Sequence, residues 1–455
     1  MALARYYGAA SYLFLLSGLG LIALSFWRRH AWMFALIFLG GVMIGLWRGG
    51  LEMEGLAVYA NAIGKTTTIT GRVSADLQAA TRGGQAITVT DIVAAGQHIN
   101  GTLYVTTKDQ PKLRRDDTVT IHGKLTPSQG TYAASIYDAS ITQLERPTNI
   151  ALDVRDTFSD ATSKALPGLE ASLGLGILVG QKSALPSDFT EALKVAGLTH
   201  IVVASGYNLT VLVRFARRIF GKISKYQAAL WSVIMILGFM AITGWSASMT
   251  RAGLVAGLSL WAWYYGRQFH PVTLLALVGA VTVMVYPPYA WNDVGWALSF
   301  AAFVGVVIMA PLLKAYFYGT EHKQGFIAQT LLETAAAQLL TLPIMLGVFG
   351  QLSIVALISN VMIVPLVSFA MLATFIAGVA QIFLPVLASI LAWPAQILLG
   401  YIVWAVNWTA SFPWAQVKWQ LPAWGVVVSY MIILAIILYL RRVTGYQLRQ
   451  VNIVE

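Results

Sequence analysis

The architecture of the chain is decided by residues 174–218, which read GLGILVGQKSALPSDFTEALKVAGLTHIVVASGYNLTVLVRFARR. The first seven residues, 174–180, are apolar, but they are too few to cross a bilayer alone. A short amphipathic helix is predicted next, capped by Ser187 or Asp188 and ending at Gly197. Its apolar positions fall on one face, so we expect it to lie on a membrane and not in it.

An interrupted apolar segment follows this helix. It begins at His200, is broken by Ser205, Gly206, Tyr207 and Asn208, and ends in a basic cluster, Arg214, Arg217 and Arg218. A break at membrane depth leaves backbone groups that only protein or a watery cavity can satisfy. Residues 200–213 are therefore the predicted lining of a path across the membrane.

The composition is that of a polytopic membrane protein. Of 455 residues, 57% are hydrophobic and 11% are charged, whereas soluble domains carry about 25% charge. The 15 Trp and 19 Tyr residues suit interfacial aromatic belts. The net charge of +11 partly reflects basic inside loops, and it would also attract a polyanion. Because the chain has no Cys, disulfides, thiolate metal sites and cysteine nucleophiles are excluded.

Apolar segments of spanning length fill both ends of the sequence. Two predicted spans, 8–26 and 31–47, are joined by a basic loop that should face the cytoplasm, which places the residues after 50 outside. Later segments lie at 226–244, 251–266, 271–286, 294–313, 327–349, 353–380, 386–411 and 423–440. With basic loops inside, we predict about eleven spans plus re-entrant or interfacial helices. The predicted domains are a helix pair (1–50), an extracytoplasmic barrel (51–149), a transmembrane domain (150–440) and a basic cytoplasmic tail (441–455).

Residues 66–146 have a different character, because Thr, Val and Ile alternate there with polar residues between recurrent turns. We predict five strands, at 66–77, 85–94, 98–107, 117–125 and 132–144. Five short antiparallel strands indicate a small all-β barrel, with an OB fold the leading choice. Such barrels bind single strands through aromatic rings and a basic groove. The candidates are Tyr104, Lys108, Lys112, Arg114, Arg115, Tyr132 and Tyr137; alternatively, these are solvated loop charges and ordinary barrel tyrosines.

Polar residues in the apolar half need a physical reason, because a charge at the bilayer centre costs at least about 2.5–3.5 kcal/mol. A hydrophilic lining for charged cargo would use Arg251, Asp293, Glu333, Gln338 and Asn360, together with His200. The alternatives are snorkelling or a plain ion pair for the first two, a helix cap for Glu333 and an interfacial hydrogen bond for His200. We expect Arg251, Asp293 and the 205–208 break to share one polar cavity, with Arg251 meeting phosphates.

No catalytic or metal-binding pattern stands out. The six His residues form no H-x-x-x-H or H-x-H pair, and Ser205 lacks a base on another span. The triplet Gly64-Lys65-Thr66 lacks the rest of a phosphate loop. We therefore expect no enzyme, no metal and no cofactor.

Three stretches resemble the ComEC-type competence proteins, the inner-membrane channels of bacterial DNA uptake. They are LGILVGQKSALP through GLTHIVVASGYN, then MTRAGL with YPPYAWNDVGWALSFAA, and lastly AAAQLLTLPIMLGVFGQLSIVALISNVMIVPL, which together cover about 170–370. Two departures stand out. Family members read SGLH where this chain has Ser205 to Asn208, and many continue into a metallo-β-lactamase-like nuclease domain, whose H-x-H-x-D-H run is absent here.

The resemblance implies a function and a set of partners. The chain is expected to pass single-stranded DNA into the cytoplasm during natural transformation, from the bacterial inner membrane. It would need a DNA receptor protein on the outer side, a separate cytoplasmic ATPase or helicase, a separate nuclease and the lipid bilayer. The alternative is a secondary transporter of a small anionic or lipid-linked molecule. Transporters often have two repeated halves with matching broken helices, and no such repeat is visible.

Overall fold

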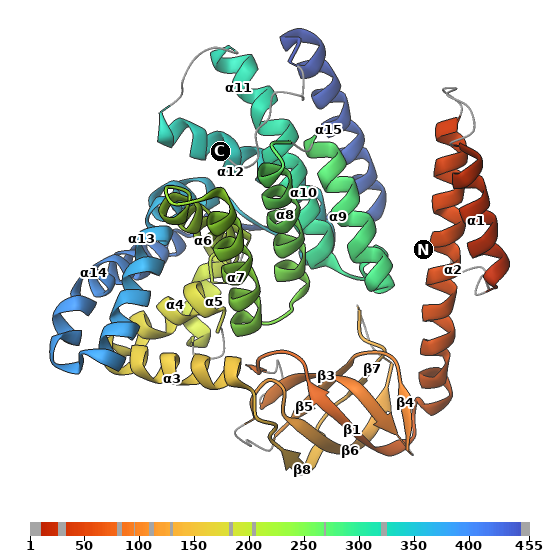
Figure 1. Ribbon diagram of the computed structural model, residues 1–455, viewed down its shortest axis with the longest axis horizontal. Coiled ribbons are helices and arrows are strands. Elements are labelled where there is room, and N and C mark those ends of the chain that lie inside the picture. The colour runs from red at the N-terminus through yellow and green to blue at the C-terminus, as the bar shows by residue number, and fades with distance from the viewer. Residues whose placement is uncertain are drawn as a thin grey trace. The chain divides into compact units, whose positions relative to one another are not determined.

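The computed structural model describes residues 11–25, 33–79, 84–94, 96–108, 113–127, 131–181, 185–202, 206–267, 270–319 and 325–446. The chain divides into two compact units, each treated by itself below (Figure 1). The first comprises residues 1–149 with 279–293, and the second comprises 150–278 with 294–455.

The first unit contains a helical hairpin and a β-barrel. The hairpin is α1 (Tyr12–Ser25) and α2 (Met33–Ala62). Its helices approach closely at two glycines, because a Cβ atom built on Gly40 would lie 2.7 Å from the backbone oxygen of Gly18. Small residues allow such approaches between membrane helices. The unit also includes the end of α9 (Pro271–Val285) and a 3₁₀ turn, η2 (Pro287–Ala290).

The barrel has the strand order of an OB fold. Its strands are β1 (Thr66–Val73), β2 (Gln78–Ala79), β3 (Gln85–Ala94), β4 (Gln97–Ile99), β5 (Leu103–Thr107), β6 (Thr118–Thr126), β7 (Ala134–Ile136) and β8 (Ser140–Glu145). The order β1-β3-β5-β7-β6 closes through a β1–β6 pairing, and β5 and β7 run parallel. Both β7 and β8 pair with β6, so they are successive parts of one fifth strand. The predicted five-stranded OB-like barrel is confirmed.

Backbone conformation breaks two of the five predicted strands. The predicted strand 98–107 is divided into β4 and β5 by residues around Gly101, which has φ +133°. The predicted strand 132–144 is divided into β7 and β8 beside Asp138, which has φ +52°. Glycine and aspartate tolerate these positive φ values better than most residues. Alternation still holds in β5, where Leu103 and Val105 are fully buried and Tyr104 faces outward.

The second unit is mostly helical. Its helices are α3 (Ile150–Ala165), α4 (Gly168–Val179), α5 (Ser187–Val195), α6 (Gly206–Phe220), α7 (Lys225–Thr243), α8 (Ala247–Tyr264), the start of α9, α10 (Val294–Val304), α11 (Ala310–Tyr318), α12 (Phe326–Ile344), α13 (Ala356–Phe383), α14 (Pro385–Ala410) and α15 (Ala423–Thr444). Two π-helical segments, η3 (Gly305–Met309) and η4 (Met345–Phe349), extend α10 and α12. A short ladder joins β9 (Gln351–Ser353) to β10 (Gln416–Lys418).

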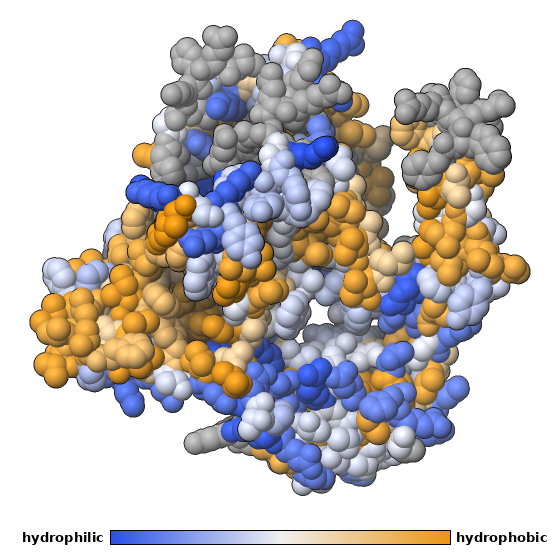
Figure 2. All heavy atoms as spheres, viewed as in Figure 1, coloured by the Kyte–Doolittle hydropathy of each residue, from blue (hydrophilic) through white to orange (hydrophobic). Residues whose placement is uncertain are grey.

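The main core of this unit surrounds α4. Every residue from Leu173 to Val179 is buried, and the cluster continues through α13 and α14. A Cβ atom on Gly174 would lie 2.9 Å from the side chain of Thr374, so the glycine lets α13 approach α4. Hydrophobic residues also cover the outer side of α13 and α14, whereas hydrophilic residues are frequent on the barrel (Figure 2). An apolar outer surface of this kind suits lipid.

Seven helices within the described ranges are long and apolar enough to cross a membrane. They are Met33–Ala62, Lys225–Thr243, Val294–Tyr318, Ile327–Phe349, Ala356–Phe383, Pro385–Ala410 and Ala423–Thr444. Shorter apolar helices occupy Tyr12–Ser25, Gly168–Val179 and Pro271–Val285. The membrane class is thus confirmed, while the number of about eleven spans stays a prediction. The predicted broken span becomes α6, a 15-residue helix outside the seven.

The predicted cap of α5 is wrong. Pro186 holds the N-cap position without a side-chain cap bond, and the Ser187 hydroxyl donates to a carboxylate oxygen of Asp188 at 3.2 Å. The predicted end is correct, because Gly197 adopts φ +73° directly after the helix. A Cβ atom there would lie 2.5 Å from the Cβ of Ala356, so this glycine also seats the loop against α13.

Candidate nucleic-acid interface and membrane path

Three predicted tyrosines form one cluster on the barrel. The ring centroid of Tyr104, on β5, lies 5.4 Å from that of Tyr132 and 6.4 Å from that of Tyr137. Tyr137 is 47% exposed, so part of the cluster faces solvent. Burial, with the neighbouring Tyr132 and Tyr137 hydroxyls, raises the pKa of Tyr104, which keeps its phenol neutral. Neutral, partly exposed rings offer surfaces on which bases can stack.

The predicted cations do not all join these tyrosines. Lys108 forms an exposed ion pair with Asp138 at 3.2 Å, and pairs of this kind hold their partners weakly. Arg114 instead donates to the carbonyl of Pro147 at 3.4 Å, in the segment that leaves the barrel. Arg115 is half-buried, and Lys112 lies outside the described residues.

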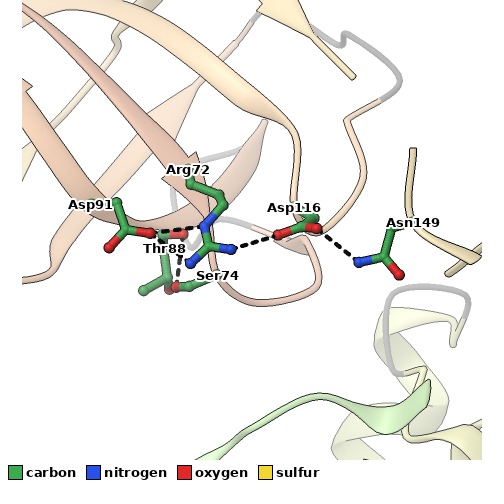
Figure 3. A network of polar contacts seen from close by, with 6 residues as sticks. All are labelled: Arg72, Ser74, Thr88, Asp91, Asp116 and Asn149. Carbon is green, nitrogen blue, oxygen red and sulfur yellow. Dashed lines mark hydrogen bonds and ion pairs between the residues drawn. The ribbon is translucent and has the colours of Figure 1, made fainter. Parts of the chain in front are cut away.

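Acidic side chains of the barrel serve as anchors. Arg72 donates to Asp91 at 2.9 Å and to Asp116 at 3.1 Å, and Asn149 donates to the other oxygen of Asp116 at 2.8 Å (Figure 3). The fully buried Asp117 receives two hydrogen bonds from Arg146, each 3.0 Å long. Asp116 and Asp117 therefore hold the segment 146–149, which follows the last strand, against the barrel. In the described part of the chain, no group of three or more His, Asp or Glu could hold a metal ion.

A second polar contact of the first unit holds the end of α9. The Arg48 guanidinium, on α2, donates to the carbonyls of Met284 and Val285 at 3.0 and 3.1 Å. Glu52, one turn further along, pairs with the same guanidinium at 3.3 Å. The Tyr286 hydroxyl donates to the carbonyl of Thr131 at 3.1 Å, beside the tyrosine cluster. A cation at the last carbonyls of a helix satisfies acceptors that the helix leaves open.

The end of α5 and the loop after it are fixed to β9 and to the first turns of α13. The hydroxyls of Ser353 and Ser359 donate to the carbonyls of Val195 and Ala196, each at 2.6 Å. His200 hydrogen-bonds with the side chain of Asn360 and the backbone of Gly197. Two predicted path residues, His200 and Asn360, are thus in contact. Asn360 is 5% exposed, while His200 keeps an exposed surface.

Asn208 joins the first turn of α6 to α4. Its side-chain amide donates to the Ile177 carbonyl at 2.7 Å, and the residue is 1% exposed. That carbonyl lies in the last turn of α4, where the helix has no partner for it. Gly206 begins the helix, and a Cβ atom there would lie 3.1 Å from the Cβ of Ala252. Ser205 and the side chain of Tyr207 lie outside the described residues.

Arg251 is buried between α8 and α10. Its Nε donates to the Ser299 hydroxyl at 3.3 Å, one terminal nitrogen donates to the Gly295 carbonyl at 3.4 Å, and the ring of Phe300 lies 6.0 Å away. Only 6% of the residue is exposed. Asp293 belongs to the first unit, whereas Arg251 belongs to the second. The polar cavity that Arg251, Asp293 and the 205–208 break were expected to share therefore stays a prediction.

The two predicted residues of α12 are half-buried. Glu333 accepts a hydrogen bond from the Gln329 amide, one turn earlier, at 2.8 Å, and Gln338 lies a little more than one turn further along the same helix. Sequence reasoning missed Arg48 and Tyr286. An arginine followed four residues later by Glu52, inside an apolar segment, was the available signal for the first of them.

Comparison with known proteins points to one family. A model described as "Competence protein" matches residues 177–443. The "ComE operon protein 3" of Bacillus subtilis is 24% identical over 245 residues, which are 53% of this chain and 30% of that protein. The "Competence protein ComA" of Neisseria gonorrhoeae is 27% identical over 231 residues, 48% of this chain and 32% of that protein. The matched part thus spans about a third of each relative. No solved structure matches the chain.

Proposed function

The chain belongs to the competence protein family, and from that premise we propose that it conducts single-stranded DNA across the bacterial inner membrane during natural transformation. It is a multi-pass protein of that membrane, with seven helices of spanning length in its described part. The family match carries the proposal, because it covers the helical unit from Ile177 to Val443. The match covers only about a third of the length of each relative. A role in DNA uptake is therefore itself part of the proposal.

The barrel would receive the strand. Tyr104, Tyr132 and Tyr137 offer rings to successive bases, and this mode of binding tolerates any sequence because every base has a flat face. Lys108 lies beside them in an ion pair that an arriving phosphate can replace, because both partners are exposed. We expect this surface to lie outside the membrane.

Polar groups of the helical unit would line the path. His200 and Asn360 form one contact on the α5–α13 side, and Glu333 and Gln338 follow each other along α12. Polar side chains inside a membrane domain are expensive and usually face a watery cavity or one another. Asn208 and Arg251 support the path by holding helices together, because the Asn208 amide, the Arg251 Nε and one Arg251 terminal nitrogen already bind backbone or hydroxyl oxygens. We expect Asp293 and residues 205–207 to complete the proposed lining.

The proposed pore works with separate partners: a receptor that delivers DNA outside, a nuclease that removes one strand and a cytoplasmic ATPase or helicase that pulls the other. Hydrolysis of a phosphodiester uses metal ions held by carboxylates and histidines. Asp91 and Asp116 are instead bound to Arg72, Asp117 to Arg146, and Asp138 to Lys108. We propose that the strand arrives single and is drawn in by another protein.

The test is a deletion strain that receives fluorescent duplex DNA. Loss of the label from the cytoplasm, with the label retained outside the inner membrane, supports the channel. Complementation with the full chain should restore transfer, while a strain deleted for a small-molecule transporter serves as the control for general membrane damage. Normal transformation in the deletion strain would reject the proposal, and an accompanying loss of small-anion flux would indicate a secondary transporter.

A further inference from the structure

The helix α6 has three different faces. Its buried face, around Leu209, Val213 and Ala216, packs into the core of the second unit. A second face carries exposed apolar side chains, Phe215 at 48% and Ile219 at 43%. The third face carries exposed arginines, Arg214 and Arg218. A helix that only packed against protein and faced water would not present an exposed apolar stripe beside a basic one.

Both exposed stripes continue into the turn that follows α6. Lys222 extends the basic stripe with a spacing of four residues, and Ile223, which is 67% exposed, extends the apolar stripe in the same way. We call Arg214, Arg218 and Lys222 the basic stripe, and Phe215, Ile219 and Ile223 the apolar stripe. Parallel stripes of this kind are typical of helices that lie in the membrane interface with the cations at the headgroups.

Aromatic contacts place the end of α6 level with the ends of two neighbouring helices. The guanidinium carbon of Arg217 lies 4.4 Å from the ring centroid of Trp263, near the end of α8. The Lys225 ammonium, at the start of α7, lies 5.6 Å from the same ring and 5.7 Å from that of Tyr264. Trp261 and Tyr265 are exposed beside them. Trp and Tyr concentrate where membrane helices meet the headgroups.

We propose that α6 lies in the membrane interface and that its basic stripe binds the headgroups of anionic phospholipids. Charge complementarity favours a phospholipid surface over nucleic acid, because a DNA strand on the basic stripe would leave the neighbouring apolar stripe in water, whereas a bilayer takes up both. The inference needs only the membrane location of the chain, and it holds whether or not the chain conducts DNA. It gives α6 a role as an amphipathic anchor in place of the predicted crossing segment.

The first experiment uses native mass spectrometry of the full chain with phosphatidylglycerol or phosphatidylcholine of equal acyl chains. Each cation near an anionic membrane surface raises binding about fivefold, so R214Q/R218Q/K222Q should lose the phosphatidylglycerol preference by about tenfold or more. The charge-preserving R214K/R218K/K222R should keep it. A control with the same loss of charge elsewhere, K65Q/K124Q/K418Q, should also keep it.

Two results would overturn the proposal, and a third would assign the basic stripe to another ligand. An unchanged lipid preference in the Arg214, Arg218 and Lys222 triple variant would overturn the proposal, as would an equal loss in the control. A variant with unchanged lipid preference but weaker binding of a fluorescent oligo(dT) would assign the basic stripe to nucleic acid.

The second experiment measures depth. Because the chain has no Cys, Phe215→Cys and Arg218→Cys each accept one nitroxide label in reconstituted bilayers. Oxygen, which partitions into lipid, should relax the label at residue 215 more strongly, and a water-soluble nickel chelate should relax the label at 218 more strongly. Equal access of the nickel chelate to both positions would contradict an interfacial α6.

Discussion

Replacement of Asn208 by leucine tests whether this residue holds two helices together or contacts cargo. The side-chain amide is 1% exposed and donates to the Ile177 carbonyl at 2.7 Å. Leucine has the same branching and number of side-chain heavy atoms but no donor, so the carbonyl would lose its partner in a buried place. An unsatisfied buried acceptor costs about 1–3 kcal/mol, and hydrogen bonds measured between membrane helices average about 0.6 kcal/mol. We expect Asn208→Leu to lower the free energy of unfolding by about 1–2 kcal/mol.

Asn208→His provides the matched comparison. An imidazole N–H can replace the amide as a donor, and family members carry histidine at this position according to the resemblance described above. This variant should therefore lose less stability than the leucine variant. Thr210→Val, on the same helix, removes a hydroxyl that binds the Gly206 carbonyl within α6. It is the control for losing a polar side chain whose hydrogen bond stays within one helix.

Equilibrium unfolding in mixed micelles of mild detergent and SDS gives the three free energies, and transformation frequency gives the functional effect. A structural role predicts that transformation falls only as far as the folded fraction falls. Wild-type stability of Asn208→Leu combined with a large loss of transformation would refute this account and return Asn208 to the lining of the path.

Five further outcomes are expected. Tyr104→Ala combined with Tyr137→Ala should weaken oligo(dT) binding by the full chain by about 30-fold or more, seen in fluorescence anisotropy, because each of the two stacked bases contributes about 1–3 kcal/mol; unchanged affinity would leave the tyrosines as ordinary barrel residues. Binding should also fall with salt, with a log–log slope of about −0.7 per phosphate contacted. Gly40→Val should destabilise the α1–α2 hairpin by about 1–3 kcal/mol in SDS unfolding, since the added Cβ would meet the backbone of α1. Asp117→Asn should cost about 1–2 kcal/mol, discounted because Arg146 is half exposed, and the backbone amides of the 146–149 segment should then exchange hydrogen for deuterium faster. Purified protein with Mg²⁺, Mn²⁺ or Zn²⁺ and ATP should leave labelled DNA uncut and ATP intact; metal-dependent cleavage that follows this polypeptide would reveal a missed active site.

The barrel could be predicted from sequence because its signal is local. Alternation with a period of two over residues 66–146 identifies strands and their buried faces directly, and β5 follows it residue by residue. The divisions at Gly101 and Asp138 could not be predicted, because they depend on positive φ values that the closed barrel imposes. Long apolar helices such as α13 and α14 were equally clear from composition.

The segment after His200 was harder to interpret for a physical reason. Its apolar residues, at 201–204, 209 and 211–213, form one hydropathy maximum, although residues 206–220 form an amphipathic helix. The period of α6 becomes visible only once its start at Gly206 is known. The same limit applies to partners. The energetic cost of a polar side chain in an apolar segment singles out Arg251, Asn208 and Asn360, but it does not identify their partners. The Arg251–Ser299 contact, for example, joins residues 48 positions apart and depends on helix packing.

The Arg48 contact shows how far this limit extends. Its guanidinium reaches Met284, which is 236 residues away in sequence, and no periodicity connects segments so distant. The first unit can therefore gather residues from both sides of the six described helices α3 to α8. Sequence reasoning identified the residue types that need partners and left the choice of partner to the tertiary structure.

The most direct test of the central proposal is to trap DNA inside the protein during uptake. Competent cells take up duplex DNA in which one strand carries 4-thiothymidine, and ultraviolet light cross-links it to protein at intervals after mixing. We expect cross-linked adducts between this chain and single-stranded DNA. Peptides from the Tyr104–Tyr137 surface should appear in these adducts earlier than peptides from the helical unit. Fewer barrel adducts should form after Tyr104→Ala. Adducts with duplex DNA alone, or efficient transformation without any adduct to this chain, would contradict the claim that a single strand passes through it.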